Sequence, residues 1–164
     1  MLSTQDPTAV AYRRILCPVD FSECSRKAFY TAVGYARLFQ AELDILHVSE
    51  RTLSGAGYEE VEAEATLMAR LEAGLVRRLD ELQADGLVTN DDRERMILEI
   101  AGGKPWVEIL RYAEAREVDL IVMGTHGHAG LRHALIGSQA ERVVRRAACH
   151  VLTVKPDGFA PEVG

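Results

Sequence analysis

Cysteine, aromatic residues and long apolar runs are all scarce in this 164-residue sequence. Its three cysteines are widely spaced and odd in number, which argues against a disulfide framework. No apolar window approaches the length of a membrane span, and residues 1–7 lack the apolar centre of a secretory signal. The net charge of −6 argues against broad binding to nucleic acid or to an anionic membrane, although it permits a local anion site. We therefore expect a reduced, cytoplasmic protein that binds neither nucleic acid nor membrane.

Short apolar runs alternate with helical patterns along the whole chain, whose length suits one domain. The expected strands are residues 14–20, 43–48, 95–100, 119–123 and 150–154, and the expected helices are residues 22–40, 59–83, 106–116 and 138–147. Strands that alternate with helices pair in parallel through right-handed crossovers, so the pattern predicts a doubly wound α/β fold. We expect a flexible N-terminal arm (1–12), one nucleotide-binding domain (13–155) and a loose C-terminal tail (156–164).

A glycine-rich segment follows the fourth expected strand. Gly124-Thr125-His126-Gly127 is separated by nine residues from Gly137-Ser138, where a helix is expected to begin. Glycines let backbone N–H groups approach a phosphate, and a helix N-terminus offers unpaired donors and a partial positive charge. The Ser138 hydroxyl could cap the helix or donate to a phosphate oxygen. The segment indicates a nucleotide site, and the alternative is a tight turn that needs positive φ and nothing more.

A second candidate segment, Pro18-Val19-Asp20, ends the first expected strand. Ligands of doubly wound folds bind beyond the carboxyl ends of the strands, at the point where the strand order reverses. If the first and fourth strands are neighbours at that point, Asp20 and Gly124 face one crevice. Asp20 then either caps the next helix or accepts a hydrogen bond from a ribose hydroxyl, and the two roles are compatible. We favour the ribose role.

Several segments, in the same order, resemble the universal stress protein family and its ATP-binding branch. The matching segments are 15–22, 46–48, 103–105, the glycine motif of Gly124, Gly127, Gly137 and Ser138, and 140–143. The resemblance spans roughly residues 13–155. It implies a five-stranded parallel sheet in the order 3-2-1-4-5 with helices on both faces. The first and fourth strands are then adjacent, as the crevice requires.

The resemblance also implies ATP as the ligand, with or without Mg²⁺. The residues implied at the adenosine end, where Asp20 would meet the ribose and the Val48 backbone the adenine, are Pro18, Val19, Asp20 and Val48. The residues implied around the ribose and phosphates are Met123, Gly124, His126, Gly127, Gly137, Ser138, Gln139 and Ala140.

Three functions compete for this site. The first is an ATP-binding regulatory module of the stress response, and the second is a slow ATPase or self-phosphorylating enzyme. The glycine motif lacks the lysine of a Walker-type loop, and no acidic pair is spaced to hold magnesium, so we expect no catalytic residue. The third is a dimeric scaffold with an empty crevice, which would suit a chain without the motif. We favour the regulatory module, and we expect Gly124→Val or Gly137→Val to abolish nucleotide binding without unfolding the sheet.

The remaining candidate residues have structural explanations. His126, His128 and His133 fit no zinc spacing and are expected to be solvated, and His47 is expected to be a hydrogen-bonded core residue. Cys24 falls in the first turn of a helix, where we expect an inert thiol, and Cys17 and Cys149 are expected to serve packing. The cluster of Arg142, Arg145 and Arg146 is expected to be a solvated helix face, and the apolar stripe over residues 61–82 to pack on the core.

The fifth strand predicts an oligomer. Val151, Leu152 and Val154 would form an apolar edge of the sheet, and such edges are usually covered or paired. The related family is usually dimeric through its fifth strand. We therefore expect a homodimer.

Overall fold

The computed structural model describes residues 10–50, 58–126 and 136–157. The strands within these ranges are β1 (Arg14–Val19), β2 (Glu42–Ser49), β3 (Met96–Gly102), β4 (Leu120–Gly124) and β5 (His150–Val154). The helices are α1 (Glu23–Phe39), α2 (Tyr58–Ala84), α3 (Asn90–Glu94), α4 (Pro105–Ala115) and α5 (Ser138–Arg146). The predictions made for Gly127, His128 and His133, for residues 1–9 of the arm and for residues 158–164 of the tail lie outside the described residues.

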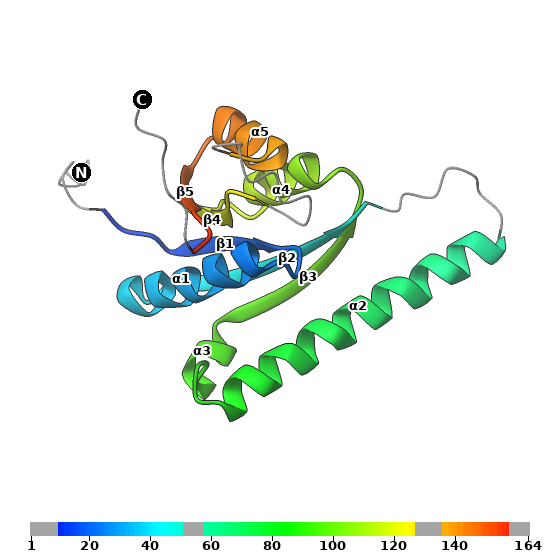
Figure 1. The fold of residues 1–164 in the computed structure, drawn as a ribbon, viewed down its shortest axis with the longest axis horizontal. Coiled ribbons are helices and arrows are strands. Elements are labelled where there is room, and N and C mark those ends of the chain that lie inside the picture. Colours follow the sequence, from blue (N-terminus) through cyan, green and yellow to red (C-terminus); the bar gives the residue numbers. More distant parts are fainter. Residues whose placement is uncertain (1–9, 51–57, 127–135, 158–164) are drawn as a thin grey trace, which may run out of the picture.

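The five strands form one parallel sheet in the order β3-β2-β1-β4-β5, so the predicted fold class and strand order are confirmed (Figure 1). β1 is the central strand: Ile15 pairs with Leu43 of β2 on one side and with Leu120 of β4 on the other. From β1 the chain first builds outward through β2 to β3, and then crosses back to β4 and β5. The strand order therefore reverses between β1 and β4.

The sheet separates two apolar cores, because successive residues of a strand point to opposite faces. Ile15, Ile45 and Val122 face α1 and α2, whereas Leu16 and Ile121 face α4 and α5. Figure 1 shows the same three layers, with α1 and α2 on one side of the sheet and α4 and α5 on the other. Helices cover both faces, which explains why the strands read as continuous apolar runs.

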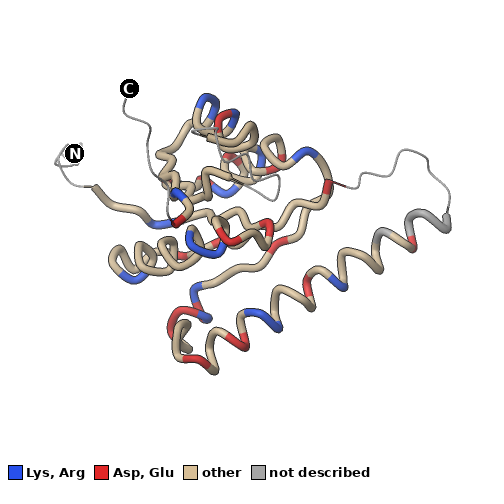
Figure 2. Tube along the Cα trace, viewed as in Figure 1, with Lys and Arg blue, Asp and Glu red and all other residues tan. Residues whose placement is uncertain are grey.

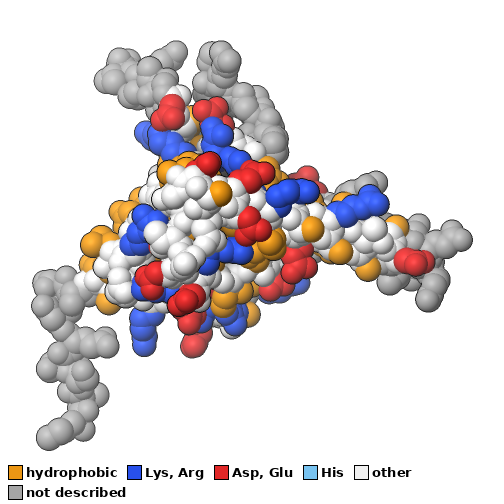
Figure 3. Space-filling model, turned by 90° about the horizontal axis from the view of Figure 1, so that it is seen from below, with side chains coloured by type: hydrophobic (Ala, Val, Ile, Leu, Met, Phe, Trp, Pro, Cys, Tyr) orange, Lys and Arg blue, Asp and Glu red, His pale blue; other side chains and the backbone are white. Residues whose placement is uncertain are grey.

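Helix α2 packs on the sheet along only part of its length. Leu75, Leu79 and Leu82 are buried against the α1 side of the sheet, whereas Ala65 is exposed. The N-terminal end of α2 projects from the body of the molecule, to the right in Figures 1 and 3. The apolar stripe predicted over residues 61–82 therefore packs in the core from Leu75 to Leu82. None of the described helices is long and apolar enough to span a membrane.

The short helix α3 was not predicted. Its N-cap Thr89 accepts a hydrogen bond from the Asp92 backbone, and the Asp92 carboxylate accepts one from the Thr89 N–H, which together form a capping box. Arg37 of α1 donates from Nη2 to the same carboxylate at 2.6 Å. These hydrogen bonds lower the pKa of Asp92 to about 2. The contact between Arg37 and Asp92 therefore holds α3, which follows the C-terminal end of α2 and precedes β3, against α1.

Charged residues of both signs are interspersed along the described helices and strands (Figure 2). Two described carboxylates are buried, Asp92 of α3 and Asp44 of β2, and the Asp44 side chain is fully shielded from solvent. Its carboxylate accepts hydrogen bonds from Arg14 Nη1 at 3.1 and 3.2 Å and from the Tyr112 hydroxyl at 3.1 Å. Arg116 Nε lies 3.5 Å away. Asp44 thus links β1, β2 and the C-terminal part of α4.

Candidate functional site

The candidate site lies at the carboxyl edge of the sheet, where the strand order reverses. β1 ends at Val19 and β4 ends at Gly124, and the two strands are hydrogen-bonded neighbours. The sequence placed Asp20 and Gly124 in one crevice on condition that these strands were adjacent. The structure meets this condition, because both residues end or follow adjacent parallel strands at the same edge.

The turn after β1 is held by its own side chains. Asp20 Oδ1 accepts a hydrogen bond from the Ser22 N–H at 3.0 Å, and Ser25 Oγ accepts one from the Asp20 N–H at 3.1 Å. Ser22 is the N-cap of α1, so the alternative that Asp20 caps this helix is wrong. Asp20 instead closes the turn that delivers Ser22 to the helix.

The end of β2 is fixed against the end of β1. His47 Nδ1 lies 2.8 Å from the Val19 carbonyl, and because a carbonyl only accepts, Nδ1 carries the proton. The imidazole also packs against the Phe21 ring at 4.8 Å between centroids. His47 is therefore hydrogen-bonded, as predicted, although it is half-buried rather than fully enclosed. The next residue, Val48, is half-buried and packs on the α4 side of the sheet.

Gly124 allows α1 to approach β4 closely. A Cβ at this position would lie 2.9 Å from Cys24 Sγ and 3.1 Å from the Cys24 carbonyl carbon. The preceding residue, Met123, is buried, and the following Thr125 is held by its N–H, which donates to the Val154 carbonyl at 2.9 Å. His126 Nδ1 is hydrogen-bonded to Thr125 Oγ1 at 2.8 Å. The absence of a side chain at Gly124 is thus already required by packing within the protein.

The N-terminal end of α5 lies next to the carboxyl end of β4 and is hydrogen-bonded to the residue that follows this strand. The Gly137 N–H donates to the Thr125 carbonyl at 2.6 Å, and a Cβ at Gly137 would lie 2.9 Å from that oxygen. The two described ends of the glycine segment therefore meet at this edge. Gly127 and the residues that join it to Ile136 lie outside the described part of the chain.

Helix α5 begins without a side-chain cap. Its N-cap is Gly137 and Ser138 is its first residue, so the alternative that the Ser138 hydroxyl caps the helix is wrong. The backbone N–H groups of Ser138, Gln139 and Ala140 have no acceptor within the helix. Gln139 Oε1 accepts a hydrogen bond from the Trp106 N–H at 3.3 Å, and the Ala140 side chain is buried. The exposed Ser138 side chain and this row of backbone donors therefore offer hydrogen bonds to an anion.

A comparison with known protein families identifies the family of this chain. The model of the universal stress protein family matches residues 11–155. The chain belongs to the universal stress protein family.

Individual relatives share both sequence and fold. Universal stress protein MJ0531 of Methanocaldococcus jannaschii is 34% identical over 148 residues, which cover 88% of this chain and 82% of that protein. The structure of universal stress protein UspA from Lactobacillus plantarum superposes with a TM-score of 0.70 at 28% identity, over 89% of this chain and 99% of that one. A universal stress protein solved in complex with cAMP has a TM-score of 0.61 at 21% identity, over 88% of this chain and 98% of that one.

The cysteines of this universal stress protein serve packing. Cys24 is buried next to Gly124, and its thiol donates to the Val154 carbonyl at 3.2 Å. Cys17 is enclosed in the core, and burial raises the pKa of its thiol to about 12. Burial also raises the pKa of Cys149. The packing interpretation of Cys17 and Cys149 is confirmed.

The arginine cluster of α5 is more than the solvated face predicted from the sequence. The guanidinium carbons of Arg142 and Arg146 lie 5.8 and 5.1 Å from the centroid of the Trp106 ring, which is within cation–π range. Arg145 pairs with Glu141 one helical turn earlier. Through these contacts with Trp106, Arg142 and Arg146 hold α5 against the start of α4, beside the carboxyl edge of the sheet where the candidate site lies. Within the described ranges, no three His, Cys, Asp or Glu side chains gather as a metal site would require.

Proposed function

We propose that this universal stress protein binds ATP at the carboxyl ends of β1 and β4 and acts as a regulatory module in the stress response. One observation carries the proposal: the uncapped N-terminus of α5 lies against the end of β4. Three backbone donors and the positive end of the helix dipole thus occupy the edge of the sheet that also carries Asp20. A nucleotide supplies the matching groups, since its phosphates accept from the donors and its ribose donates to a carboxylate.

The residues of the site divide by the part of ATP that they would contact. The phosphates would lie on the backbone of residues 137–140 and on the Ser138 hydroxyl, with Gly124, His126 and Gly127 beside them. The adenosine would lie toward Pro18, Val19, Asp20 and Val48, with Met123 beside its ribose. Lys104, the exposed N-cap of α4 at the same edge, would neutralise phosphate charge, and Mg²⁺ would do the same if it accompanies the nucleotide.

The family supports this ligand class at the level of the fold. A universal stress protein that shares the fold, at 21% identity, was solved with cAMP, which is an adenine nucleotide. A regulatory role is favoured over turnover because the glycine motif contains no lysine of the kind that a Walker-type loop uses on the γ-phosphate.

The identity of the nucleotide that the protein retains through purification tests both ATP binding and the absence of efficient turnover. We would purify it without added nucleotide, denature it, and identify the released molecules by chromatography against ATP, ADP and AMP. About one ATP per chain would support the regulatory module, and mostly ADP would favour slow hydrolysis. No nucleotide released, followed by no affinity in a titration with and without Mg²⁺, would refute the proposal and favour the scaffold.

Ser138→Glu should separate nucleotide binding from folding. A carboxylate in the first turn of α5 interacts favourably with the helix dipole, by about 0.3–1 kcal/mol, so the fold should be preserved. The same carboxylate would repel the phosphates, and we expect the affinity for ATP, measured by calorimetry, to fall about tenfold or more.

Two controls accompany this variant. Ser138→Ala removes only the hydroxyl and should cost less affinity than Ser138→Glu. Asn90→Asp adds one negative charge to the first residue of α3, at the amino edge of the sheet, and should leave the affinity unchanged. Unaltered ATP binding by Ser138→Glu would exclude the N-terminus of α5 as the phosphate site.

We also propose that the protein forms a homodimer through β5, as its apolar edge (Val151, Leu152, Val154) led us to expect. β5 is the last strand of the sheet, and its backbone bonds to the β4 side through the His150 N–H and the Val154 carbonyl. Alternate residues of a strand point to opposite edges, so Val151 and Thr153 direct their N–H and C=O groups outward. A second copy of β5 would pair with these groups.

Thr153→Pro tests the dimer. It removes one outward N–H without touching the ladder to β4, and proline is tolerated on edge strands in this position. We expect the dissociation constant of the dimer, measured by sedimentation, to rise about tenfold or more, while the unfolding midpoint changes little. Thr153→Ala keeps the N–H and should remain dimeric. A wild-type protein that is monomeric at all concentrations would contradict the proposal.

A further inference from the structure

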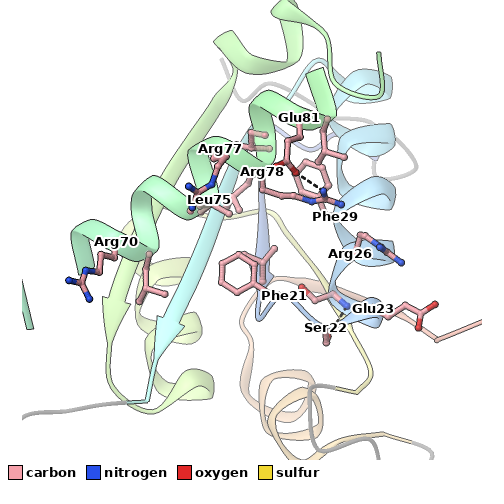
Figure 4. A pocket seen from close by; sticks show the side chains of 17 residues that line it. Phe21, Ser22, Glu23, Arg26, Phe29, Arg70, Leu75, Arg77, Arg78 and Glu81 are labelled. Atoms are coloured by element: carbon pink, nitrogen blue, oxygen red, sulfur yellow. Dashed lines mark hydrogen bonds and ion pairs between the residues drawn. The ribbon is translucent and has the colours of Figure 1, made fainter. Parts of the chain in front are cut away.

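A cavity of about 550 Å³ opens between α1 and α2, on the face of the sheet opposite to α4 and α5. This volume lies within the range of roughly 300–1,000 Å³ that is typical of small-molecule sites. Its floor is Val19 and Ile45 of the sheet, and its walls come from the start of α1 and the C-terminal half of α2 (Figure 4). Of the residues implied for the nucleotide, only Val19 also lines this cavity.

The inner surface of the cavity is largely apolar. Phe21 and Phe29 line the cavity from the β1–α1 side and Leu75 lines it from α2 (Figure 4). Leu79 of α2 is also part of the lining. The Phe21 side chain is 49% exposed, which is unusual for a large apolar residue. Phe21 also has a φ of 65°, a strained value for an aromatic residue, and it follows Asp20 directly in the turn. The turn therefore holds an aromatic ring at the mouth of the cavity.

Positive charge surrounds this apolar interior. The lining contains four arginines and two glutamates, and Arg78 is paired with Glu81 at 2.7 Å. Among the residues that the structure describes, the guanidinium groups of Arg26, Arg70 and Arg77 have no carboxylate partner. The mouth thus carries unpaired positive charge on a protein whose net charge is −6. A guanidinium stays charged and binds a carboxylate through two N–H donors.

We propose that this cavity binds a free aliphatic carboxylate, with its hydrocarbon chain between α1 and α2 and its carboxylate on the arginines of the α2 rim. The apolar floor and the two aromatic rings suit a hydrocarbon chain, and the excess of arginine suits one anionic group. A single chain is favoured over a membrane surface because the cavity is a space between two helices, bounded by the sheet. Apart from Val19, the lining of this cavity is distinct from the residues that we propose for the nucleotide at the carboxyl edge of the sheet.

Gly74 of α2 provides a direct test because it lines the cavity and its absent side chain leaves room. A Cβ there would meet only Arg77 Nη2, at 4.0 Å, so the backbone has room for the first side-chain atom of Gly74→Leu, and we expect the rest of the side chain to occupy part of the cavity. Leucine also favours a helix more than glycine does, so the variant should be at least as stable as the wild type. Gly34→Leu is the matched control, since Gly34 is an exposed residue of α1 with no atom within 4 Å of its Cβ position.

The probe is decanoate, titrated below the concentration at which it forms micelles and followed by calorimetry on the full chain. We expect binding by the wild type and by Gly34→Leu, and a loss of about tenfold or more in affinity for Gly74→Leu. Arg77→Gln should weaken decanoate but leave the uncharged decanol unaffected. No decanoate binding by the wild type, or equal binding by Gly74→Leu, would overturn the proposal, as would an equal loss of decanoate and decanol in Arg77→Gln. ATP binding is measured in parallel, and its loss or retention bears only on the nucleotide site.

Discussion

Asp44→Ala is expected to lower the free energy of unfolding by about 3 kcal/mol. The Asp44 carboxylate is completely buried, and it accepts from Arg14 and from the Tyr112 hydroxyl. Removing it would leave a largely buried guanidinium with Glu42 as its remaining partner and a hydroxyl without its acceptor. Because a buried donor that loses its acceptor keeps its full desolvation cost, the loss exceeds that of a surface ion pair.

Urea denaturation of three variants would measure this effect. Asp44→Asn keeps the size and one acceptor oxygen but removes the charge, so it should lose less stability than Asp44→Ala. Arg116→Ala removes a guanidinium that is 40% exposed and 3.5 Å from Asp44, and its midpoint should stay close to that of the wild type. A value for Asp44→Ala within about 1 kcal/mol of the wild type, the range of an exposed pair, would show that the cluster contributes little.

The sequence predicted the fold well because its strands and helices differ in their local patterns. The runs 43–48, 119–123 and 150–154 coincide with strands to within a residue or two at each end, since strands covered on both faces are continuously apolar. The order of the strands followed from the family resemblance and not from periodicity. α3 was missed because five residues show little periodicity, although the pattern from Thr89 to Asp92 is that of a capping box.

The placement of the candidate site residues in the fold was predictable from the sequence, but the hydrogen bonds among them were not. The sequence located Asp20 and the glycine segment, because strand ends carry ligands in this fold class. It could not assign the caps: Ser22 and Gly137 act as N-caps in place of Asp20 and Ser138, a difference of one or two residues that depends on backbone angles. The Asp44 cluster joins residues 30 to 72 positions apart, and the cavity depends on how α2 lies against the sheet. Neither feature has a local signal.

Gly124→Val is expected to destabilise the fold by about 3 kcal/mol, contrary to the expectation from the sequence that only nucleotide binding would suffer. The Cβ alone would lie 2.9 Å from Cys24 Sγ and 3.2 Å from the Cys24 carbonyl oxygen, so α1 must move away from β4. That movement would also strain the bond from the Cys24 thiol to the Val154 carbonyl. A loss of ATP binding in this variant is therefore not diagnostic of the loop, whereas the Ser138→Glu variant, which leaves this packing intact, is.

A double-mutant cycle isolates the contact. Gly124→Ala adds only the Cβ and should cost about 1–2 kcal/mol in thermal or urea unfolding. In a Cys24→Ala background the Sγ is gone while the backbone of residue 24 remains, so the cost of Gly124→Ala should fall to part of that value. The coupling between the two positions should be at least about 0.5 kcal/mol, as for residues in direct contact. Costs that simply add would show that the Cys24 Sγ contributes nothing to the penalty, which would then come from the Cys24 backbone. A Gly124→Ala variant that loses no stability in either background would mean that the ligand, and not the fold, requires a glycine at this position.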